Sequence, residues 1–402
     1  MSPLRIAVVS TFYPNPSAPY RTLFVRHLVQ ALAAQADVRM LAPIPYAPPW
    51  PPGRRWRSLR AVPREHEDGP LRIGHPRYVV IPKIDAFSGF SYFRAVLPWL
   101  RRMQAERPID VLHAHCAYPD GVGVALAARE LGVPLVVTAH GSDLNLDARR
   151  RSLRFQMRWA LGRAARVIAV SEDLRRKALS LVPEVQARVS CIPCAGVDAA
   201  VFHRGDRLAA RRELSLAPGS RVALFVGNLV PIKALDVLLA SWGRLLGAGT
   251  VGDTDRLILI GDGVLRQQLS TAARAVELRG TVLLLGALPQ QQIAAWMRAA
   301  SVLCLSSHEE GMPNVVIEAL SCGLPVTATA VGGIPDLVKP PLNGCLAAPG
   351  DARRFAQALG EAFGRNWDAD QIAATTAGYN WKDLATRNLE VLRSAAGRPA
   401  IK

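Results

Sequence analysis

Short runs of apolar residues alternate along the whole chain with longer stretches in which apolar and polar residues mix. Runs that stay apolar throughout are typical of strands buried on both faces of a parallel sheet, and the stretches between them are long enough for covering helices. The pattern therefore predicts an α/β protein built from parallel sheets. The predicted strands are Arg5–Ser10, Val38–Ala42, Val111–Ala114, Leu135–Ala139, Val167–Val170 and Val189–Ile192 in the first half, and Val222–Val226, Leu257–Ile260, Val282–Leu285, Val302–Leu305 and Pro325–Ala328 in the second.

This alternation occurs twice, and a chain of 402 residues exceeds what a single core usually holds. Between the two halves, the segment CAGVDAAVFHRGD, which begins at Cys194, has no clear periodicity. We therefore predict two doubly wound domains, residues 1–195 and 207–378, joined by a linker at residues 196–206. A last helix, about Trp381 to Ala395, follows the aromatic segment GYNW within residues 379–402.

Two proline-rich stretches interrupt the pattern of the first domain, at Pro43–Pro63 and Pro70–Ser91. They mix aromatic residues with arginines, and loops of this length in a compact domain are usually functional or mobile. We interpret them as an excursion from the domain. Two interpretations stay open, a site for an amphiphilic acceptor and a proline-stiffened surface loop.

The string EEGMPNVVIEALSCGLPV places two carboxylates, Glu310 and Glu318, eight positions apart. We predict that Asn314 is the N-cap of a short apolar helix, Val315–Ser321, which Gly323 closes. The free amides at the start of this helix would form an anion site between the two carboxylates. Such a site suits a phosphorylated polyol such as a nucleotide sugar, whose hydroxyls the glutamates would bind.

Three more loops follow predicted strands of the second domain, at the sheet edge where open α/β folds bind ligands. One loop carries Gly227 and Lys233, a second carries Gly261 and Gly263, and a third has the sequence AVGGIPDLV. The second loop lacks the third glycine of a dinucleotide-binding turn, which disfavours a nicotinamide enzyme. We expect the amides of all three loops to approach phosphate or sugar groups.

Polar residues also follow two predicted strands of the first domain. His140 stands at a strand end in VVTAHGSDL, and His113, His115 and Asp120 sit at another strand end in LHAHCAYPDG. A histidine at a strand end can bind a substrate, although a lone histidine more often satisfies a backbone group. A metal site here would need more ligands at suitable spacing, so none is predicted.

Together these strings resemble the E-x7-E signature of the retaining glycosyltransferases of family 4, above all the bacterial enzymes that build exopolysaccharide or teichuronic acid. The resemblance covers nearly the whole chain. It implies the GT-B fold, in which two Rossmann-like domains face each other across a cleft and a terminal helix returns to the first domain. It also implies retaining, metal-independent transfer of a sugar from a nucleotide-diphosphate donor to a hydroxyl of a lipid-linked or growing cell-surface polysaccharide, without a cofactor.

The resemblance further implies roles for individual residues. Asn228 and Ala234 stand where the family has Arg and Gly, so the charge of the diphosphate would fall on Lys233 and on backbone amides. The implied catalytic residues are His140, Glu310 and Lys233. The implied donor-binding residues are Asn228, Gly261, Gly263, Arg266, Gly311, Met312, Pro313, Asn314, Val315 and Glu318. On the acceptor side the resemblance implies Arg21 and Asp143, and the place at a strand end adds His115 and Asp120.

The formal charge of +17 comes mostly from arginine clusters in the N-terminal half. An anionic membrane surface is a candidate partner for such a charge, at about 1 kcal/mol per cation. Nucleic acid could use the same charge, but no helix-turn-helix, zinc-finger or RNP-like pattern accompanies it, so we expect no nucleic-acid partner. The chain has no apolar run long enough for a membrane span or a signal peptide, and we expect a cytoplasmic protein, peripheral on the inner face of the membrane.

The spacing of the cysteines predicts neither a metal site nor a disulfide. Cys191 and Cys194 form a lone C-x-x-C without the second pair that a zinc site would need. We expect buried thiols.

Three rival functions stay open. A glycosidase also uses two carboxylates, but eight helical residues span roughly 12 Å, beyond the separation of about 5 to 9.5 Å that such pairs need. A sugar-nucleotide epimerase of the same fold would change the donor without an acceptor. A basic membrane-binding or nucleic-acid-binding module would explain the charge but not the glutamate string.

Overall fold

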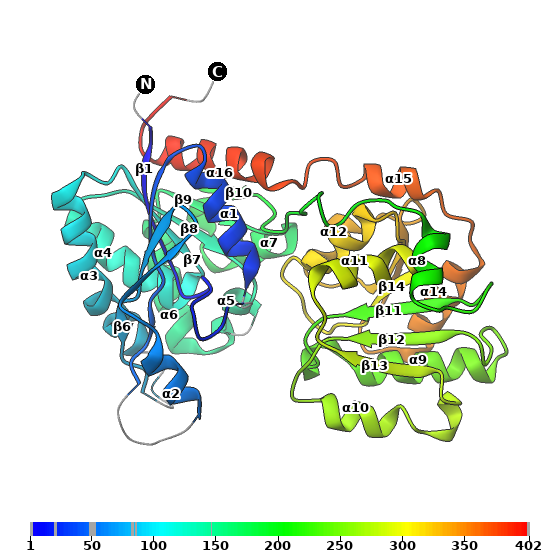
Figure 1. Cartoon of the computed structure of the whole chain (residues 1–402). Helices are drawn as coiled ribbons and strands as arrows, with labels where there is room; N and C mark the ends of the chain where they lie inside the picture. The colour runs from blue at the N-terminus through cyan, green and yellow to red at the C-terminus, as the bar shows by residue number, and fades with distance from the viewer. Residues whose placement is uncertain are drawn as a thin grey trace. The chain divides into compact units, whose positions relative to one another are not determined.

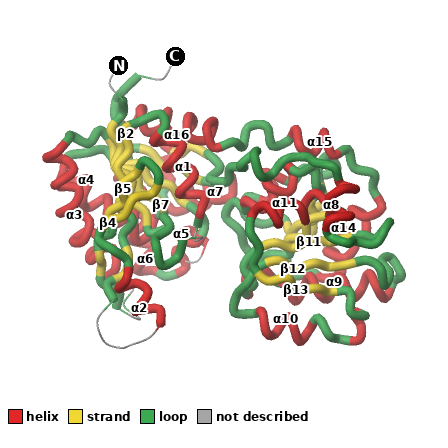
Figure 2. The backbone as a smooth tube through the Cα atoms, viewed as in Figure 1, coloured by secondary structure: helices red, strands yellow, loops and turns green. Residues whose placement is uncertain are grey.

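The computed structural model describes residues 3–19, 22–47, 54–81, 84, 87–145 and 147–399. The chain divides into two compact units, Met1–Cys194 with Trp381–Lys402, and Ala195–Asn380. Each unit has a central sheet with helices packed on it (Figures 1 and 2). The prediction of an α/β protein with two doubly wound sheets is confirmed.

The sheet of the first unit has the strand order β10-β9-β8-β7-β1-β2-β5-β4, and its strands are parallel except for β4. Its first strand, β1, lies in the middle, with β2 on one side and β7 on the other, so the strand order reverses beside β1. The strands are β1 (Arg5–Ser10), β2 (Asp37–Leu41), β4 (Glu65–Asp68), β5 (Leu71–Gly74), β7 (Val111–His115), β8 (Leu135–Ala139), β9 (Arg166–Ala169) and β10 (Val189–Cys191), and a separate pair is formed by β3 (Ile44–Pro45) and β6 (Arg77–Tyr78).

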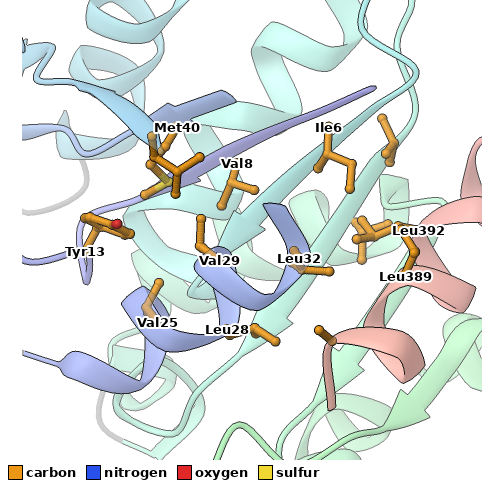
Figure 3. Packing of buried hydrophobic residues seen from close by; sticks show 14 of the residues in the cluster. Ile6, Val8, Tyr13, Val25, Leu28, Val29, Leu32, Met40, Leu389 and Leu392 are labelled. Atoms are coloured by element: carbon orange, nitrogen blue, oxygen red, sulfur yellow. The ribbon is translucent and has the colours of Figure 1, made fainter. Parts of the chain in front are cut away.

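The last helix of the chain packs in the first unit. Helix α16 buries Leu384, Ala385, Leu389 and Leu392, a stripe at the spacing of one helix face. Figure 3 shows Leu389 and Leu392 in one cluster with residues of α1 and β1. The helices of this unit are α1 (Leu23–Ala33), α2 (Arg54–Ala61), α3 (Ser88–Glu106), α4 (Val122–Leu131), α5 (Ser142–Asn145), α6 (Arg151–Arg163), α7 (Glu172–Leu181) and α16 (Trp381–Ala395).

The sheet of the second unit is parallel throughout, in the order β13-β12-β11-β14-β15-β16. The order reverses between β11 and β14, the position at which open α/β sheets bind ligands. The strands are β11 (Val222–Val226), β12 (Arg256–Ile260), β13 (Val282–Gly286), β14 (Val302–Leu305), β15 (Val326–Thr329) and β16 (Gly344–Ala347). The helices are α8 (Arg207–Glu213), α9 (Leu235–Gly247), α10 (Arg266–Ala272), α11 (Gln290–Ala299), α12 (Asn314–Ser321), α13 (Ile334–Leu337), α14 (Ala352–Gly364) and α15 (Ala369–Ala374).

Every strand predicted from an apolar run is present, with ends displaced by at most one residue. The excursion is only partly a loop, because Leu71–Gly74 joins the main sheet beside β2 and Glu65–Asp68 pairs with it in antiparallel register. The sequence EHED gave no sign of this strand because it has no apolar residue. Charged residues on an edge strand protect it from pairing with other chains. Within the described ranges, no helix has the length and apolar composition that crossing a membrane requires.

Candidate functional site

The candidate site of the second unit is built from loops at the carboxyl ends of adjacent strands. Gly227 follows β11, Gly261 follows β12, Ser306 follows β14 and Gly332 lies beyond β15. Because these strands are parallel neighbours, their loops meet at one edge of the sheet, around the point where the strand order reverses. The structure therefore brings the predicted donor-binding loops together.

The loops after β11 and β12 are in direct backbone contact. The amide of Gly227 donates to Ile260 O (3.0 Å), and the amide of Leu229 donates to Asp262 O (2.9 Å). A Cβ atom at Gly261 would overlap the carbonyl oxygen of Gly227, and one at Gly263 would overlap that of Leu229. Gly261 and Gly263 were predicted to be glycines so that a nucleotide can approach the backbone. The structure adds a second cause, because the neighbouring loop already fills the space that a side chain would need.

Lys233 and Glu310 form the charged centre of this edge. Lys233 ends a short 3₁₀ turn after β11, and its Nζ lies 2.5 Å from Glu310 Oε1. The hydroxyl of Ser307 donates to the same carboxylate oxygen (2.6 Å). The side chains of Lys233 and Glu310 are only 19% and 10% exposed, so the attraction between them is weakly screened by water.

The backbone beside Lys233 is held in an unusual conformation. Ala234 has φ 46° and ψ 49°, which lie in the left-handed region that glycine adopts without steric cost. Ser306 donates from its hydroxyl to the carbonyl oxygens of Lys233 and Ala234, both at 2.9 Å. Ser306, directly after β14, therefore fixes the turn that carries Lys233. These hydrogen bonds hold Ala234 in a conformation for which the related glycosyltransferases use glycine.

Helix α12 begins one residue earlier than predicted. Pro313 is the N-cap and Asn314 the first helical residue, with no side-chain cap, so the prediction of Asn314 as N-cap is wrong. Proline cannot donate a backbone hydrogen bond, and its fixed φ suits a residue next to a helix start. The amide of Val316 donates to Pro313 O (3.1 Å), which removes it from the predicted anion site. The amides of Asn314 and Val315 precede the first intrahelical bonds.

The loop after β15 is clamped onto the loop that carries Glu310. The amide of Gly333 donates to Gly311 O (2.8 Å). Gly332 has φ +55°, and a Cβ atom there would overlap the carbonyl oxygen of Glu310. Met312 and Pro313 are buried beside this contact. The position of Glu310 thus depends on a glycine from a different strand.

The remaining donor-side residues lie in the second unit on α12, on α10 and in the loop after β11. Glu318 lies in α12, and burial raises the pKa of its carboxyl to about 7. Asn228 is exposed. Arg266, at the first position of α10, pairs with Asp262 (3.1 Å), so its charge is partly neutralised by its own turn. Helix α10 starts two residues later than the predicted start near Val264.

Three histidines of the first unit, His113, His115 and His140, lie together in its interior, and the rings of His115 and His140 are stacked. His115 Nδ1 lies 2.9 Å from His140 Nε2, and His113 Nε2 lies 2.8 Å from Thr138 Oγ1. Burial lowers the pKa of His113 and of His140 to about 3 and that of His115 well below its ordinary value. These rings are therefore neutral at pH 7. Of these three side chains, His113 and His115 are fully buried and His140 is 8% exposed to solvent.

The predicted acceptor-side carboxylates of the first unit lie inside it. Asp143 accepts from the amides of Ala117 (2.7 Å), Gly141 (2.9 Å) and Leu144 (3.0 Å), so both of its oxygens hold loop backbone. Asp120 is fully buried and accepts from the amide (2.9 Å) and hydroxyl of Thr11. Both carboxylates fix strand-end loops in this structure.

The structure gives little information on two further predictions, the role of Arg21 and the absence of a metal site. Arg21 lies outside the described residues. No group of three or more His, Cys, Asp or Glu side chains that could hold a metal ion is present in the described part of the chain. Sequence reasoning missed Ser307 and Thr11, whose signal was a position one or two residues beyond the end of a predicted strand.

Asp120 leads to a pH-dependent prediction for stability. Burial raises the pKa of Asp120 to about 8 in the folded protein, whereas an unfolded aspartate titrates near about 3.9. The folded state therefore holds the extra proton between these values, and stability falls as pH rises through that window. Asparagine cannot ionise and keeps an oxygen for Thr11. We expect the free energy of unfolding of Asp120→Asn, relative to wild type, to rise by about 1 kcal/mol per pH unit between pH 5 and 8.

Urea denaturation at several pH values measures this difference. His140→Gln is a control with a pH dependence of opposite sign. Burial lowers the pKa of His140 in the folded protein, so wild type loses stability as pH falls below the pKa of an unfolded histidine, and this variant does not. A difference between Asp120→Asn and wild type that stays constant from pH 5 to 8 would show that Asp120 is ionised in the folded protein.

Comparison with known proteins defines the class to which this architecture belongs. The family model of the group 1 glycosyl transferases matches residues 220–364, and that of the glycosyl transferase 4-like domain matches residues 22–195. The chain belongs to this family of glycosyltransferases.

Its relatives include two bacterial glycosyltransferases that match most of the chain. The chain is 28% identical to a protein of Bacillus subtilis named as the teichuronic acid biosynthesis glycosyltransferase TuaC, over 92% of this chain and 90% of that protein. It is 32% identical to the D-inositol 3-phosphate glycosyltransferase of Thermobispora bispora, over 72% of this chain and 71% of that protein.

Solved structures show the same fold at low identity. Anabaena HepE in complex with UDP has a TM-score of 0.73 at 18% identity, covering 97% of this chain and 100% of that chain. The sucrose-phosphate synthase of Thermosynechococcus elongatus has a TM-score of 0.75 at 19% identity, covering 97% of this chain and 98% of that chain. The fold is GT-B.

Proposed function

We propose that this glycosyltransferase moves a sugar, with retention of configuration, from a nucleotide-diphosphate donor to a hydroxyl of a lipid-linked or growing cell-surface polysaccharide. The observation that carries the proposal is the Lys233–Glu310 pair at the reversal of strand order. One cation and one carboxylate next to free helix amides can bind a phosphate and a sugar hydroxyl side by side. The teichuronic acid relative supports the polymer acceptor.

In the proposed reaction, the bond between the anomeric carbon and the diphosphate oxygen breaks, and a bond to the acceptor oxygen forms on the same face. The acceptor proton passes to an oxygen of the departing diphosphate. Lys233 and the amides of Asn314 and Val315 would stabilise the charge that develops on that diphosphate, the kind of effect that is usually largest in such chemistry. Glu310 would hold sugar hydroxyls, Glu318 the ribose, and neutral His140 a hydroxyl of the sugar or acceptor.

The proposal includes no bound metal and no cofactor. Lys233 already supplies a cation at the position where the diphosphate would lie, and its carboxylate partner would be free to bind hydroxyls once phosphate takes the ammonium group. Equal activity before and after treatment with EDTA is the expected result. Activity that returns only with a divalent cation would contradict this part.

Transfer of radiolabelled sugar tests the function. We expect label from one nucleotide sugar to enter a product only when an acceptor fraction from a cell envelope is present, with the anomeric configuration of the donor kept in the product by NMR. Conversion of the donor sugar without acceptor would indicate the epimerase instead. Release of sugar from a glycan without nucleotide would indicate a glycosidase.

The first unit has a surface that suits an anionic membrane. On α6, Phe155 is 73% exposed and stands among the exposed arginines 151, 154 and 158. The start of α3 adjoins this helix, because a Cβ at Gly89 would lie 3.0 Å from Gln156 Oε1, and the neighbouring Phe90 is 51% exposed. Aromatic side chains beside cations fit a headgroup layer. Flotation with anionic but not with neutral vesicles is expected, and equal flotation would count against this partner.

A further inference from the structure

A cavity of about 300 Å³ lies in the second unit at the amino-terminal ends of its strands. Arg221 precedes β11, Ser301 precedes β14 and Pro325 precedes β15, and all three line the cavity. Because the strands are parallel, this edge of the sheet is opposite to the edge that carries Lys233 and Glu310. The cavity is therefore separate from the candidate donor site.

The charged lining of the cavity is entirely positive. No Asp or Glu lines it, and its charged lining residues are Arg204, Arg207, Arg221, Arg298 and Arg365. Two of these arginines are neutralised from outside the lining, since Arg221 pairs with Asp255 (2.8 Å) and Arg204 pairs with Asp370.

The other three arginines have no carboxylate in ion-pair contact within the part of the chain that is described. Arg207 donates to Ser301 Oγ (3.1 Å), Arg298 to Val201 O (3.4 Å) and Arg365 to Pro341 O (3.2 Å). Each of these bonds uses one nitrogen of a group that has five N–H donors. Three cations gathered around one cavity repel one another, so an anion bound there would be favoured.

Two aromatic rings help to hold the guanidinium groups in place. The guanidinium of Arg365 stands 5.2 Å from the ring centre of Trp367, and that of Arg221 stands 5.6 Å from Phe363. Stacking of this kind fixes the orientation of the planar donors. Fixed donors lose less conformational entropy when they bind an anion.

The floor of the cavity is buried and uncharged. It includes Met297, Leu324 and Cys322. Burial raises the pKa of the Cys322 thiol to about 12, so the sulfur stays protonated at neutral pH. A ligand therefore meets cations at the rim and apolar atoms below them.

We infer that this cavity binds a small phosphorylated anion with at least two negative charges, such as a diphosphate or a phosphate ester with a small apolar body. Guanidinium forks match phosphate oxygens in pairs, and a cavity of this size is at the lower limit for small-molecule sites, which are about 300 to 1,000 Å³. The inference does not rest on the proposed sugar transfer. It adds to this protein a second anion site at the far edge of the same sheet.

Calorimetric titration of the full-length protein with inorganic pyrophosphate tests the inference. Arg365→Gln and Arg298→Gln each remove one unpaired guanidinium, and Arg279→Gln is the matched control, because it removes one exposed arginine of the same unit outside the cavity. All variants are made in a Lys233→Met background, so that the candidate donor site contributes as little as possible. Thermal unfolding confirms that each variant is folded.

We expect pyrophosphate to bind the Lys233→Met protein and the Arg279→Gln control with equal affinity. Each cavity variant should bind about tenfold more weakly, the effect of losing one charge-assisted hydrogen bond, and Arg365→Lys should recover part of the affinity. Equal affinity in the cavity variants and the control would overturn the inference, as would no binding to the Lys233→Met protein. Glycerol 3-phosphate as a second probe separates an ester site from a diphosphate site.

Discussion

Replacing Lys233 by methionine is expected to lower kcat/KM for sugar transfer by about 10²- to 10³-fold, the effect of removing one charge-stabilising group from an active site. Methionine keeps much of the length and apolar stem of lysine while removing the charge. The ammonium group lies 2.5 Å from Glu310 and is the cation that a diphosphate would meet at this edge of the sheet. Steady-state kinetics with the nucleotide sugar identified by the transfer assay measures the effect.

Two further variants separate catalysis from folding. Lys339→Met removes an exposed lysine of the same unit, whose Nζ donates to Pro335 O, and should leave kcat/KM unchanged. The double variant Lys233→Met with Glu310→Gln also removes the buried negative charge whose cation the single change takes away, a charge whose burial is costly. If the double variant regains wild-type activity, Lys233 only neutralises Glu310 and our assignment of a diphosphate contact is wrong.

Gly332→Ala is expected to have the second large effect. A Cβ at this position overlaps the carbonyl oxygen of Glu310, which is backbone and cannot rotate away, and φ is +55°. Left-handed strain and overpacking together should cost about 2 to 4 kcal/mol of stability in the second unit. The loop must shift, and a displacement of about 1 Å at a catalytic group can lower the rate about 10²-fold.

The control for this change is Gly219→Ala. Gly219 has φ +74° but open space around its Cβ position, so it tests the backbone strain without the overlap. We expect the control to lose only about 1 kcal/mol of stability and no activity. Equal losses of activity in the two variants would mean that Gly332 does not position Glu310.

The two sheets were readable from sequence because their strands are buried on both faces. Within Arg5–Ser10, the four consecutive residues Ile6–Val9 are all apolar and all buried, which local pattern alone reveals. Strands at the edges do not carry that signal. Glu65–Asp68 is polar throughout and Gly344–Ala347 begins with a glycine, and each pairs with one neighbouring strand.

The loops of the candidate site were also predicted, but the contacts between them were not. Lys233 and Glu310 are far apart in sequence and meet because β11 and β14 are neighbours in the sheet. The requirement for glycine at Gly261 and Gly332 comes from another loop's backbone, a cause that no single motif contains. Pro313 rather than Asn314 caps α12, a distinction of one residue that side-chain preference alone does not decide.

For the polar residues of the first unit, the sequence did not distinguish a structural role from a substrate-binding role. Motif resemblance singled out Asp143, and a place near a strand end singled out Asp120; in the structure both accept hydrogen bonds from backbone amides. A carboxylate that fixes a loop and one that binds a substrate can occupy the same motif position. The burial of His115 and Asp120 was not visible in the sequence, where both lie beyond the end of the predicted strand Val111–Ala114.

Calorimetric titration with UDP, GDP and ADP tests the central claim most directly, using wild type and Glu318→Ala. The account predicts that one of these nucleotides binds the wild-type protein and that the substitution on α12 weakens it, because the carboxylate of Glu318 would hold the ribose hydroxyls. Thermal unfolding serves to confirm that the variant keeps its fold. Failure of all three nucleotides to bind wild type, or binding that Glu318→Ala leaves unchanged, would contradict a nucleotide-sugar site at this edge of the second sheet.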